Sequence, residues 1–239
     1  MLSTTAVACH VVRSEAVLFV HGWGGSFART WREPGWEALV RDAGRDVIGV
    51  DLLGHGDAPK PHDPTAYADL TERVVAVLPD EPVDAVGFSL GAVTLLRLAA
   101  REPQRFSRLV VAGVGANLFG DDRARRDRIV AAVDGVGDSD DITAQLFRQY
   151  ANQPGNDPVA LAAVLRAPSM PISATDLSSI GCPVLVVLGD RDDAGPADPL
   201  VSALPDARLV TLKGTDHFAT TEAFACIDAV LEFLEAVPT

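Results

Sequence analysis

The sequence is poor in cysteine, and this shortage narrows the range of functions. It has three cysteines, Cys9, Cys182 and Cys226, at irregular spacing and without a cluster of ligand-type residues beside them. An odd number without regular spacing argues against a disulfide framework or a zinc site, so we expect free buried thiols. The acidic loop around Asp190 lacks the glycine and the distal glutamate of a calcium loop. We therefore predict no metal and no cofactor.

Basic charge and long apolar runs are also scarce. The chain has 20 Lys and Arg against 33 Asp and Glu, a formal net charge of -13. Nucleic acids and anionic membranes attract basic patches, so we predict no nucleic-acid partner. No run approaches the roughly 20 apolar residues of a membrane span, and the N-terminus lacks the pattern of a signal peptide. We expect a cytoplasmic protein without a membrane span, a monomer or homodimer that acts on a small molecule.

The residues that are present indicate one α/β domain. A length of 239 residues and a hydrophobic content of 48% suffice for one substantial core. Buried strands alternate with helices, which predicts a mostly parallel twisted sheet with helices on both faces. The predicted helices cover Trp36–Arg41, Tyr67–Leu78 and 92–100, and one closes the chain. The predicted strands are residues 6–12, 16–20, 46–50, 83–86, 109–113, 183–188 and 208–212.

The segment 118–176 differs in texture from the rest of the chain. It is charged at its start, and its short amphipathic pieces are interrupted by Gly, Asp and Pro. Such a segment is too short to hold much core of its own. We therefore predict a core made of residues 1–117 and 177–239, with 118–176 inserted as a small helical cap that forms an irregular lid.

One pentapeptide, Gly87-Phe88-Ser89-Leu90-Gly91, carries the strongest chemical signal. It lies between a predicted strand and a predicted helix, the context in which Gly-x-Ser-x-Gly presents a nucleophilic serine. Glycines on both sides allow the strand and helix to pack closely, and the helix N-terminus favours developing negative charge. A glycine-flanked serine in an ordinary turn is the alternative, which the rest of the chain must decide.

A serine nucleophile needs a base, and that base needs an orienting acid. His217 follows the last predicted strand, where its loop reaches the sheet edge that carries Ser89. His55 is an alternative base that we interpret as structural or pocket-rimming. His21 opens a glycine-rich loop, residues 21–25, whose backbone N–H groups are suited to an oxyanion hole. We expect the backbone of His21 to matter more than its ring.

Three aspartates compete for the role of the acid: Asp190, Asp192 and Asp193. A carboxylate in this loop can accept a hydrogen bond from the His217 ring and stabilise the imidazolium. The residues alone do not choose among the three, because each is also suited to a solvated or turn-capping role.

Together these motifs make the chain resemble an α/β-hydrolase-fold serine hydrolase of the esterase type. The order nucleophile, acid, base is the family's order. The resemblance implies that Ser89 is the nucleophile and His217 the base, that Asp192 is the acid, and that the backbone N–H groups of Trp23 and Leu90 form the oxyanion hole. The matching stretches cover nearly the whole chain: 21–25, 51–56, 87–91, 189–192 and 214–218.

The predicted reaction is cleavage of an ester-type bond through an acyl-enzyme. Apolar side chains predict a small to medium, fairly hydrophobic substrate, although simple core packing is the alternative for most of them. A carbon–carbon bond hydrolase, a thioesterase or a lactonase would use the same triad. A ligand receptor with slow turnover or a non-catalytic binding module are alternatives of another class. The candidate substrate-binding residues are Trp23, Phe119, Phe147, Met170 and Phe218.

Overall fold

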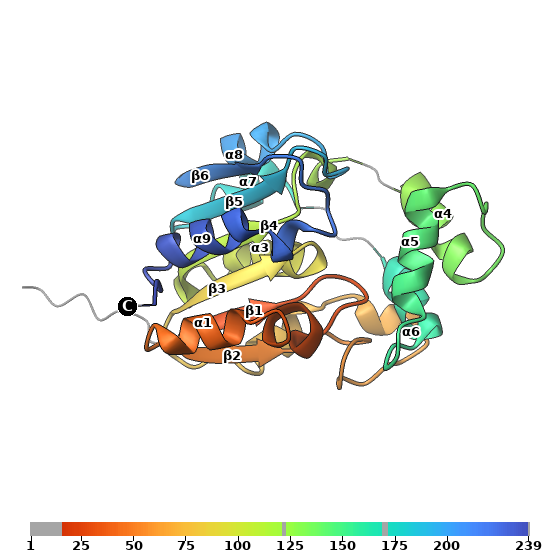
Figure 1. The fold of residues 1–239 in the computed structure, drawn as a ribbon, viewed down its shortest axis with the longest axis horizontal. Helices are drawn as coiled ribbons and strands as arrows, with labels where there is room; N and C mark the ends of the chain where they lie inside the picture. Colours follow the sequence, from red (N-terminus) through yellow and green to blue (C-terminus); the bar gives the residue numbers. More distant parts are fainter. Residues whose placement is uncertain (1–15, 121–122, 169–171, 239) are drawn as a thin grey trace, which may run out of the picture.

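A parallel six-stranded sheet forms the centre of the protein in the computed structural model, which describes residues 16–120, 123–168 and 172–238. Its strand order is β2-β1-β3-β4-β5-β6, and every neighbouring pair is parallel (Figure 1). The predicted strand at 6–12 lies outside the described residues. The strands are β1 (Ala16–Val20), β2 (Asp46–Val50), β3 (Val83–Phe88), β4 (Phe106–Ala112), β5 (Val184–Gly189) and β6 (Ala207–Leu212).

Helices cover both faces of this sheet. The α-helices are α1 (Trp36–Asp42), α2 (Thr71–Val75), α3 (Leu90–Arg101), α4 (Arg123–Val133), α5 (Ile142–Ala151), α6 (Pro158–Arg166), α7 (Ala174–Leu177), α8 (Asp198–Ala203) and α9 (Phe224–Phe233). Short 3-10 or π-helical turns are η1 (Ala28–Arg32), η2 (Pro64–Tyr67), η3 (Pro103–Arg105), η4 (Ala116–Leu118) and η5 (Thr220–Glu222). The predicted fold class is therefore confirmed.

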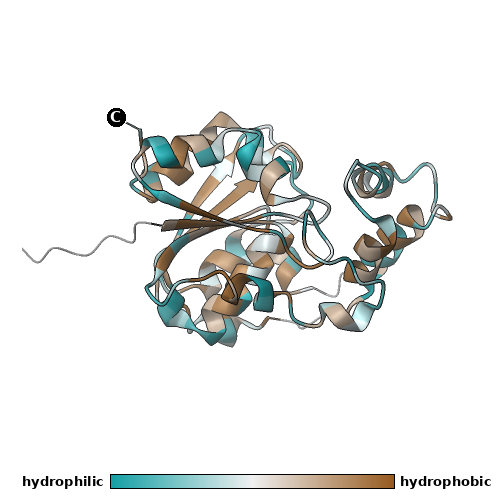
Figure 2. Cartoon of the chain, turned by 90° about the horizontal axis from the view of Figure 1, so that it is seen from below, coloured by the Kyte–Doolittle hydropathy of each residue, from teal (hydrophilic) through white to brown (hydrophobic). Residues whose placement is uncertain are grey.

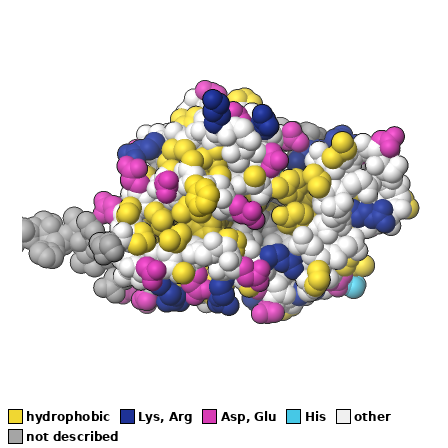
Figure 3. Space-filling view, viewed as in Figure 1, with side chains coloured by type: hydrophobic (Ala, Val, Ile, Leu, Met, Phe, Trp, Pro, Cys, Tyr) yellow, Lys and Arg dark blue, Asp and Glu magenta, His cyan; other side chains and the backbone are white. Residues whose placement is uncertain are grey.

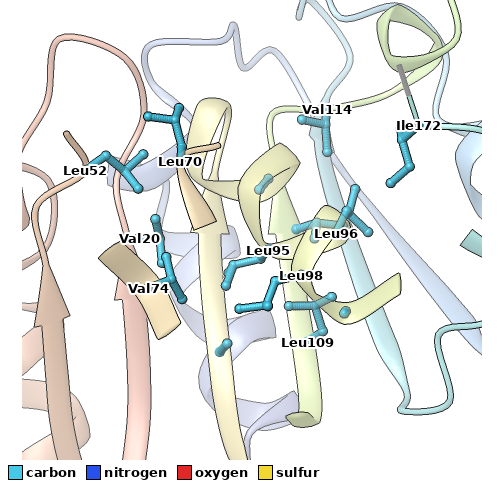
Figure 4. Packing of buried hydrophobic residues seen from close by; sticks show 14 of the residues in the cluster. Val20, Leu52, Leu70, Val74, Leu95, Leu96, Leu98, Leu109, Val114 and Ile172 are labelled. Carbon is cyan, nitrogen blue, oxygen red and sulfur yellow. The ribbon is translucent and has the colours of Figure 1, made fainter. Parts of the chain in front are cut away.

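The alternation of side chains along the strands builds two hydrophobic cores. On β1, Val17 and Phe19 enter one cluster with α1 and α9, whereas Leu18 and Val20 enter the other. Successive strand residues point to opposite faces, so one apolar run serves both layers. Figure 4 shows the second cluster, where the sheet packs against α2 and α3 through Val20, Leu52, Leu70, Val74, Leu95, Leu96, Leu98, Leu109, Val114 and Ile172.

The helix predicted over Tyr67–Leu78 is interrupted in the structure. The turn η2 begins beside Asp63, which accepts the Thr65 N–H at 2.9 Å, and the helix α2 starts only at Thr71. Asp69 accepts hydrogen bonds from both the N–H and the hydroxyl of Thr71, at 2.9 and 2.6 Å. Aspartate side chains that bond nearby backbone compete with a continuous helix, and this competition divides the predicted one.

Three helices, α4, α5 and α6, lie beyond the carboxyl ends of the strands and are called the inserted helices below. They connect β4 to β5, which are neighbours in the sheet, and stand apart from its helical layers (Figures 1 and 2). The short α7 that follows packs instead against α3 and α8. Figure 2 also shows the apolar sheet between helices whose outer sides are more polar.

One face of the molecule carries exposed apolar side chains. Figure 3 shows them gathered over the face that carries α1 and α9, among scattered acidic groups. Phe224, at the start of α9, is 84% exposed. Within the described part of the chain, no helix combines the length and the apolar character needed to cross a membrane.

Candidate active site

Ser89 occupies a strained turn between β3 and α3. Its φ is 50°, a left-handed value that is costly for a residue with a side chain. Its N–H donates to the Ala112 carbonyl of the neighbouring strand at 2.8 Å. A Cβ added at Gly91 would lie 2.3 Å from the Val20 carbonyl oxygen, so the start of α3 presses against the end of β1. Backbone packing thus holds the Ser89 hydroxyl above the sheet edge.

His217 bridges Ser89 and Asp192. Its Nε2 lies 3.0 Å from the Ser89 Oγ, and its Nδ1 lies 2.9 and 3.1 Å from the two carboxylate oxygens of Asp192. The Asp192 side chain is only 1% exposed, and its Oδ1 also accepts the Ala194 N–H at 2.8 Å. With Nδ1–H donating to the carboxylate, Nε2 is left as the acceptor that a serine hydroxyl needs. The three predicted catalytic residues thus lie in one hydrogen-bonded chain.

Backbone contacts between two loops bring Asp192, rather than its neighbours, to His217. The Arg191 N–H donates to the Thr215 carbonyl at 3.1 Å, which joins the acidic loop to the histidine loop. Asp190 also joins these two loops, because its Oδ1 accepts the Gly214 N–H at 2.7 Å. Asp193 is exposed. The choice among the three aspartates therefore depends on tertiary contacts.

The glycine-rich loop 21–25 passes directly over the serine. A Cβ added at Gly22 would lie 3.3 Å from the Ser89 Cβ and 2.9 Å from the Phe88 ring, so no larger residue fits without movement. Leu90 is the first residue of α3. The backbone amides of Trp23 and Leu90, the predicted oxyanion donors, thus belong to the two segments that flank Ser89.

Two buried histidines support this loop from below, and the prediction undervalued one of their rings. The His21 Nδ1–H donates to the Gly22 carbonyl at 2.7 Å, and its Nε2 accepts the Leu52 N–H at 3.1 Å. Burial lowers the pKa of His21 and lowers that of His55 to about 3, so both rings are neutral near pH 7. The two rings lie 5.1 Å apart. His55 is fully buried, and its choice between a structural and a pocket-rimming role stays a prediction.

Three of the predicted substrate-binding residues meet in one aromatic cluster. The Trp23 and Phe147 ring centroids are 5.3 Å apart, and those of Phe147 and Phe218 are 5.6 Å apart. Tyr150, which the sequence analysis did not select, joins them at 5.3 Å from Phe218. Phe119 is 39% exposed at the end of η4. Met170 lies outside the described residues.

A cavity of about 230 Å³ opens beside this cluster. Its wall includes Gly22 and Trp23 of the glycine-rich loop and Phe218, the residue that follows His217. Polar residues missed by the sequence analysis also line it: Arg29, Thr30, Gln153, Thr221 and Glu222. They come from three separate stretches of the chain, so no local pattern could have grouped them. A larger cavity of about 350 Å³ beside Thr94 and Arg97 of α3 shares none of these residues.

The cysteines take no part in this arrangement. Cys182 and Cys226 are buried free thiols, and Cys9 lies outside the described residues. Burial raises the pKa of Cys182 to about 11 and that of Cys226 to about 12. Both thiols therefore stay protonated near neutral pH, unlike the thiolate of a nucleophilic cysteine.

A parallel sheet with a Ser-His-Asp chain at its carboxyl edge defines a recognisable class of hydrolases. Residues 17–229 match the model of the alpha/beta hydrolase family, and the chain belongs to this family. It is 30% identical to the pimeloyl-[acyl-carrier protein] methyl ester esterase of Neisseria meningitidis serogroup C, with 92% of this chain and 94% of that protein covered. The family predicted from the motifs is thus confirmed.

Two solved structures show the same fold. One is a hydrolase from Pseudomonas aeruginosa PA01, with a TM-score of 0.69, 25% identity, and coverage of 92% of this chain and 90% of that one. The other is the enol-lactonase of Burkholderia xenovorans LB400, with a TM-score of 0.73, 23% identity, and coverage of 93% and 92%. The similarity extends over the inserted helices as well as the sheet, since little of either chain is left out.

Proposed function

We propose that the protein hydrolyses a carboxylic ester by a two-step acyl transfer through Ser89, His217 and Asp192. The observation that carries this proposal is the continuous chain of contacts from the Asp192 carboxylate through the His217 ring to the Ser89 Oγ. The family and the esterase relative support hydrolysis of a carboxylic ester as the class of reaction.

In the first step, the Ser89 Oγ attacks the ester carbonyl while Nε2 of His217 takes its proton. The negative charge on the carbonyl oxygen is received by the backbone N–H groups of Trp23 and Leu90, where one such donor is typically worth about 3–4 kcal/mol. His217 then protonates the leaving alcohol, which departs. A water molecule, deprotonated by the same ring, attacks the acyl-serine and releases the acid.

In this proposal the inserted helices cover the substrate as a cap. The predicted bounds of that cap, residues 118–176, are kept. The cavity beside the aromatic cluster has a volume of about 230 Å³, which fits a small to medium acyl group. Its wall combines aromatic side chains with polar ones, among them Arg29, Gln153 and Glu222. That the enzyme works in the cytoplasm as a monomer or homodimer stays a prediction.

The relatives suggest the first substrates to test. The Neisseria protein is named for the methyl ester of an acyl group on a carrier protein, and a methyl ester has the smallest alcohol to release. We therefore infer that methyl esters of medium-length acyl chains are the best candidates. A panel of methyl esters from four to ten carbons, with a matched thioester and a lactone, measures kcat/KM for each. Faster turnover of the thioester or the lactone would contradict this choice.

Ser89→Ala tests the nucleophile. Loss of a triad serine costs on the order of 10⁶-fold in kcat elsewhere, so turnover of p-nitrophenyl butyrate is expected to fall at least about 10⁴-fold. Labelling by a fluorophosphonate probe is expected to disappear in the same variant. A folded Ser89→Ala protein that hydrolyses the ester at the wild-type rate would exclude the proposed mechanism.

Asp192→Asn tests the acid against its neighbours. The amide leaves the geometry intact but favours the wrong tautomer of His217, which costs about 10⁴-fold in kcat in comparable triads. Asp193→Asn is the matched control, because Asp193 is exposed in the same loop, and its kcat is expected to change less than about twofold. Equal rates for the two variants would reject Asp192 as the acid.

A further inference from the structure

The loop that carries the Trp23 amide has two carbonyls, those of Gly22 and Gly24, that accept hydrogen bonds from side chains. The Gly22 carbonyl accepts the His21 Nδ1–H from below, and it also accepts the Gly25 N–H at 3.1 Å. In a trans peptide the C=O and the next N–H point to opposite sides. Holding the Gly22 carbonyl against the buried His21 ring therefore directs the Trp23 N–H away from that ring.

The second carbonyl is held from the inserted helices. The Asn156 side chain, between α5 and α6, donates from Nδ2 to the Gly24 carbonyl at 2.8 Å. The same Nδ2 donates to the Tyr150 carbonyl at 2.8 Å, so both amide hydrogens are used and the side chain is fixed. One amide group thus ties the C-terminal end of α5 to the glycine-rich loop.

The Trp23 side chain makes a second connection of the same kind. Its indole Nε1–H donates to the Leu161 carbonyl of α6 at 3.0 Å, and the residue is buried. Trp23 is therefore held through its ring by one inserted helix while the next residue is held through Asn156. Gly24, between the two contacts, has a φ of 74°, a left-handed value that glycine adopts easily.

We propose that Asn156 is a positioning residue for the oxyanion hole, so that the cap forms part of the catalytic geometry as well as covering the substrate. The inference rests on the proposed function, because it concerns the donor that Trp23 is proposed to supply. It assigns Asn156 no contact with substrate; the residue acts by fixing the Gly24 carbonyl and hence the orientation of the Trp23–Gly24 segment.

A consequence separates this role from simple packing. The oxyanion forms only during the reaction, so a misdirected Trp23 N–H lowers kcat and leaves ground-state binding nearly unchanged. It also weakens binding of a trifluoromethyl ketone, whose tetrahedral adduct with serine places an oxygen in the same hole. A purely structural contact would instead alter stability or KM.

Asn156→Asp is the variant of choice, since it keeps the shape and removes both donated hydrogens. A misplacement of about 1 Å in a site can cost on the order of 100-fold, so we expect kcat for p-nitrophenyl butyrate to fall at least about tenfold. KM is expected to stay within about twofold, and affinity for the trifluoromethyl ketone is expected to fall by the same factor as kcat. Thermal unfolding establishes that the variant is folded.

Asn152→Ala is the matched control. Asn152 lies at the same end of α5 and is exposed, and its Nδ2 likewise donates to a backbone carbonyl, but to that of Arg148 within the same helix, at 2.8 Å. Its kcat is expected to stay within about twofold of the wild type. Trp23→Phe tests the second connection, with a several-fold lower kcat expected from loss of the indole donor.

The outcomes distinguish this inference from the proposed function. If Ser89→Ala is inactive but folded Asn156→Asp keeps the wild-type kcat, or loses activity only through KM, the positioning role is wrong and the triad stands. If Ser89→Ala retains ester turnover, the proposed function itself fails. A kcat loss in Asn152→Ala as large as that in Asn156→Asp would also overturn the positioning role.

Discussion

The two segments that flank the proposed oxyanion hole are held in place by different means. At the turn around Ser89, backbone packs on backbone: the Ser89 N–H meets the Ala112 carbonyl, and Gly91 abuts the Val20 carbonyl. The loop 21–25 is instead held by side chains, from His21 below and from Asn156 above. Both segments are therefore sensitive to added atoms, at Gly91 and at Gly22, but only the loop also depends on side-chain hydrogen bonds that a substitution can delete.

Gly91→Ala tests the backbone packing at the turn and has the larger expected effect on stability. The new Cβ would stand 2.3 Å from the Val20 oxygen and 2.7 Å from the His21 oxygen, both backbone atoms that cannot turn aside. We expect the free energy of unfolding, measured in urea, to fall by about 3 kcal/mol or more, at the upper end of overpacking effects.

Gly181→Ala is the control for that substitution, since a Cβ there meets nothing within 4 Å. Its free energy of unfolding is expected to change by less than about 0.5 kcal/mol. Equal effects of the two substitutions would mean that the close approach at the turn is not what holds α3 against β1.

Acidification tests the buried histidine pair beside the loop, in which the His55 ring lies 5.1 Å from that of His21. The expected effect on stability is smaller. Burial lowers the folded pKa of His55 to about 3, below the ordinary value of 6.5, so the unfolded chain takes up the proton first. The stability of the neutral form is therefore fully present above about pH 6.5 and is lost as the pH falls towards 3. The expected slope is at most about 1.4 kcal/mol per pH unit for this group.

Urea unfolding of the wild type and of His55→Asn at pH 7.5, 6 and 5 measures this slope. The variant is expected to lose less stability on acidification than the wild type does. Parallel curves for wild type and His55→Asn would show that the buried ring does not set the acid sensitivity.

The sequence was sufficient to predict the parts of the molecule that depend on local pattern. The strands from 16 to 212 were found because each is a short, mostly apolar run with a glycine at its end or within the next few residues, and the turn at Ser89 because its glycines lie at fixed spacing. The loops that carry Asp192 and His217 were found for the same reason, but Asp192 was preferred to Asp190 and Asp193 only because of the resemblance to the family. Their meeting at 2.9 Å follows once both loops lie at the carboxyl ends of adjacent strands.

Contacts between residues far apart in the chain could not be predicted from the sequence. Asn156 and Gly24 are 132 residues apart, and Trp23 and Leu161 are 138 apart, so neither pair leaves a local pattern. The break before Thr71 was missed because apolar spacing outweighed the capping by Asp69. The ring of His21 was undervalued for a similar reason, since its partner Leu52 comes from the next strand's loop.

The way the inserted helices join the sheet bears on how this enzyme could acquire new substrates. They leave after β4 and return before β5, two paired strands, so exchanging the whole segment would leave every rung of the sheet ladder unchanged. A transplanted segment would nevertheless have to bring a donor for the Gly24 carbonyl and an acceptor for the Trp23 indole. The segment is thus exchangeable in its covalent connections, but its hydrogen bonds to the core, which also include those of Arg29 and His62, limit which replacements fit.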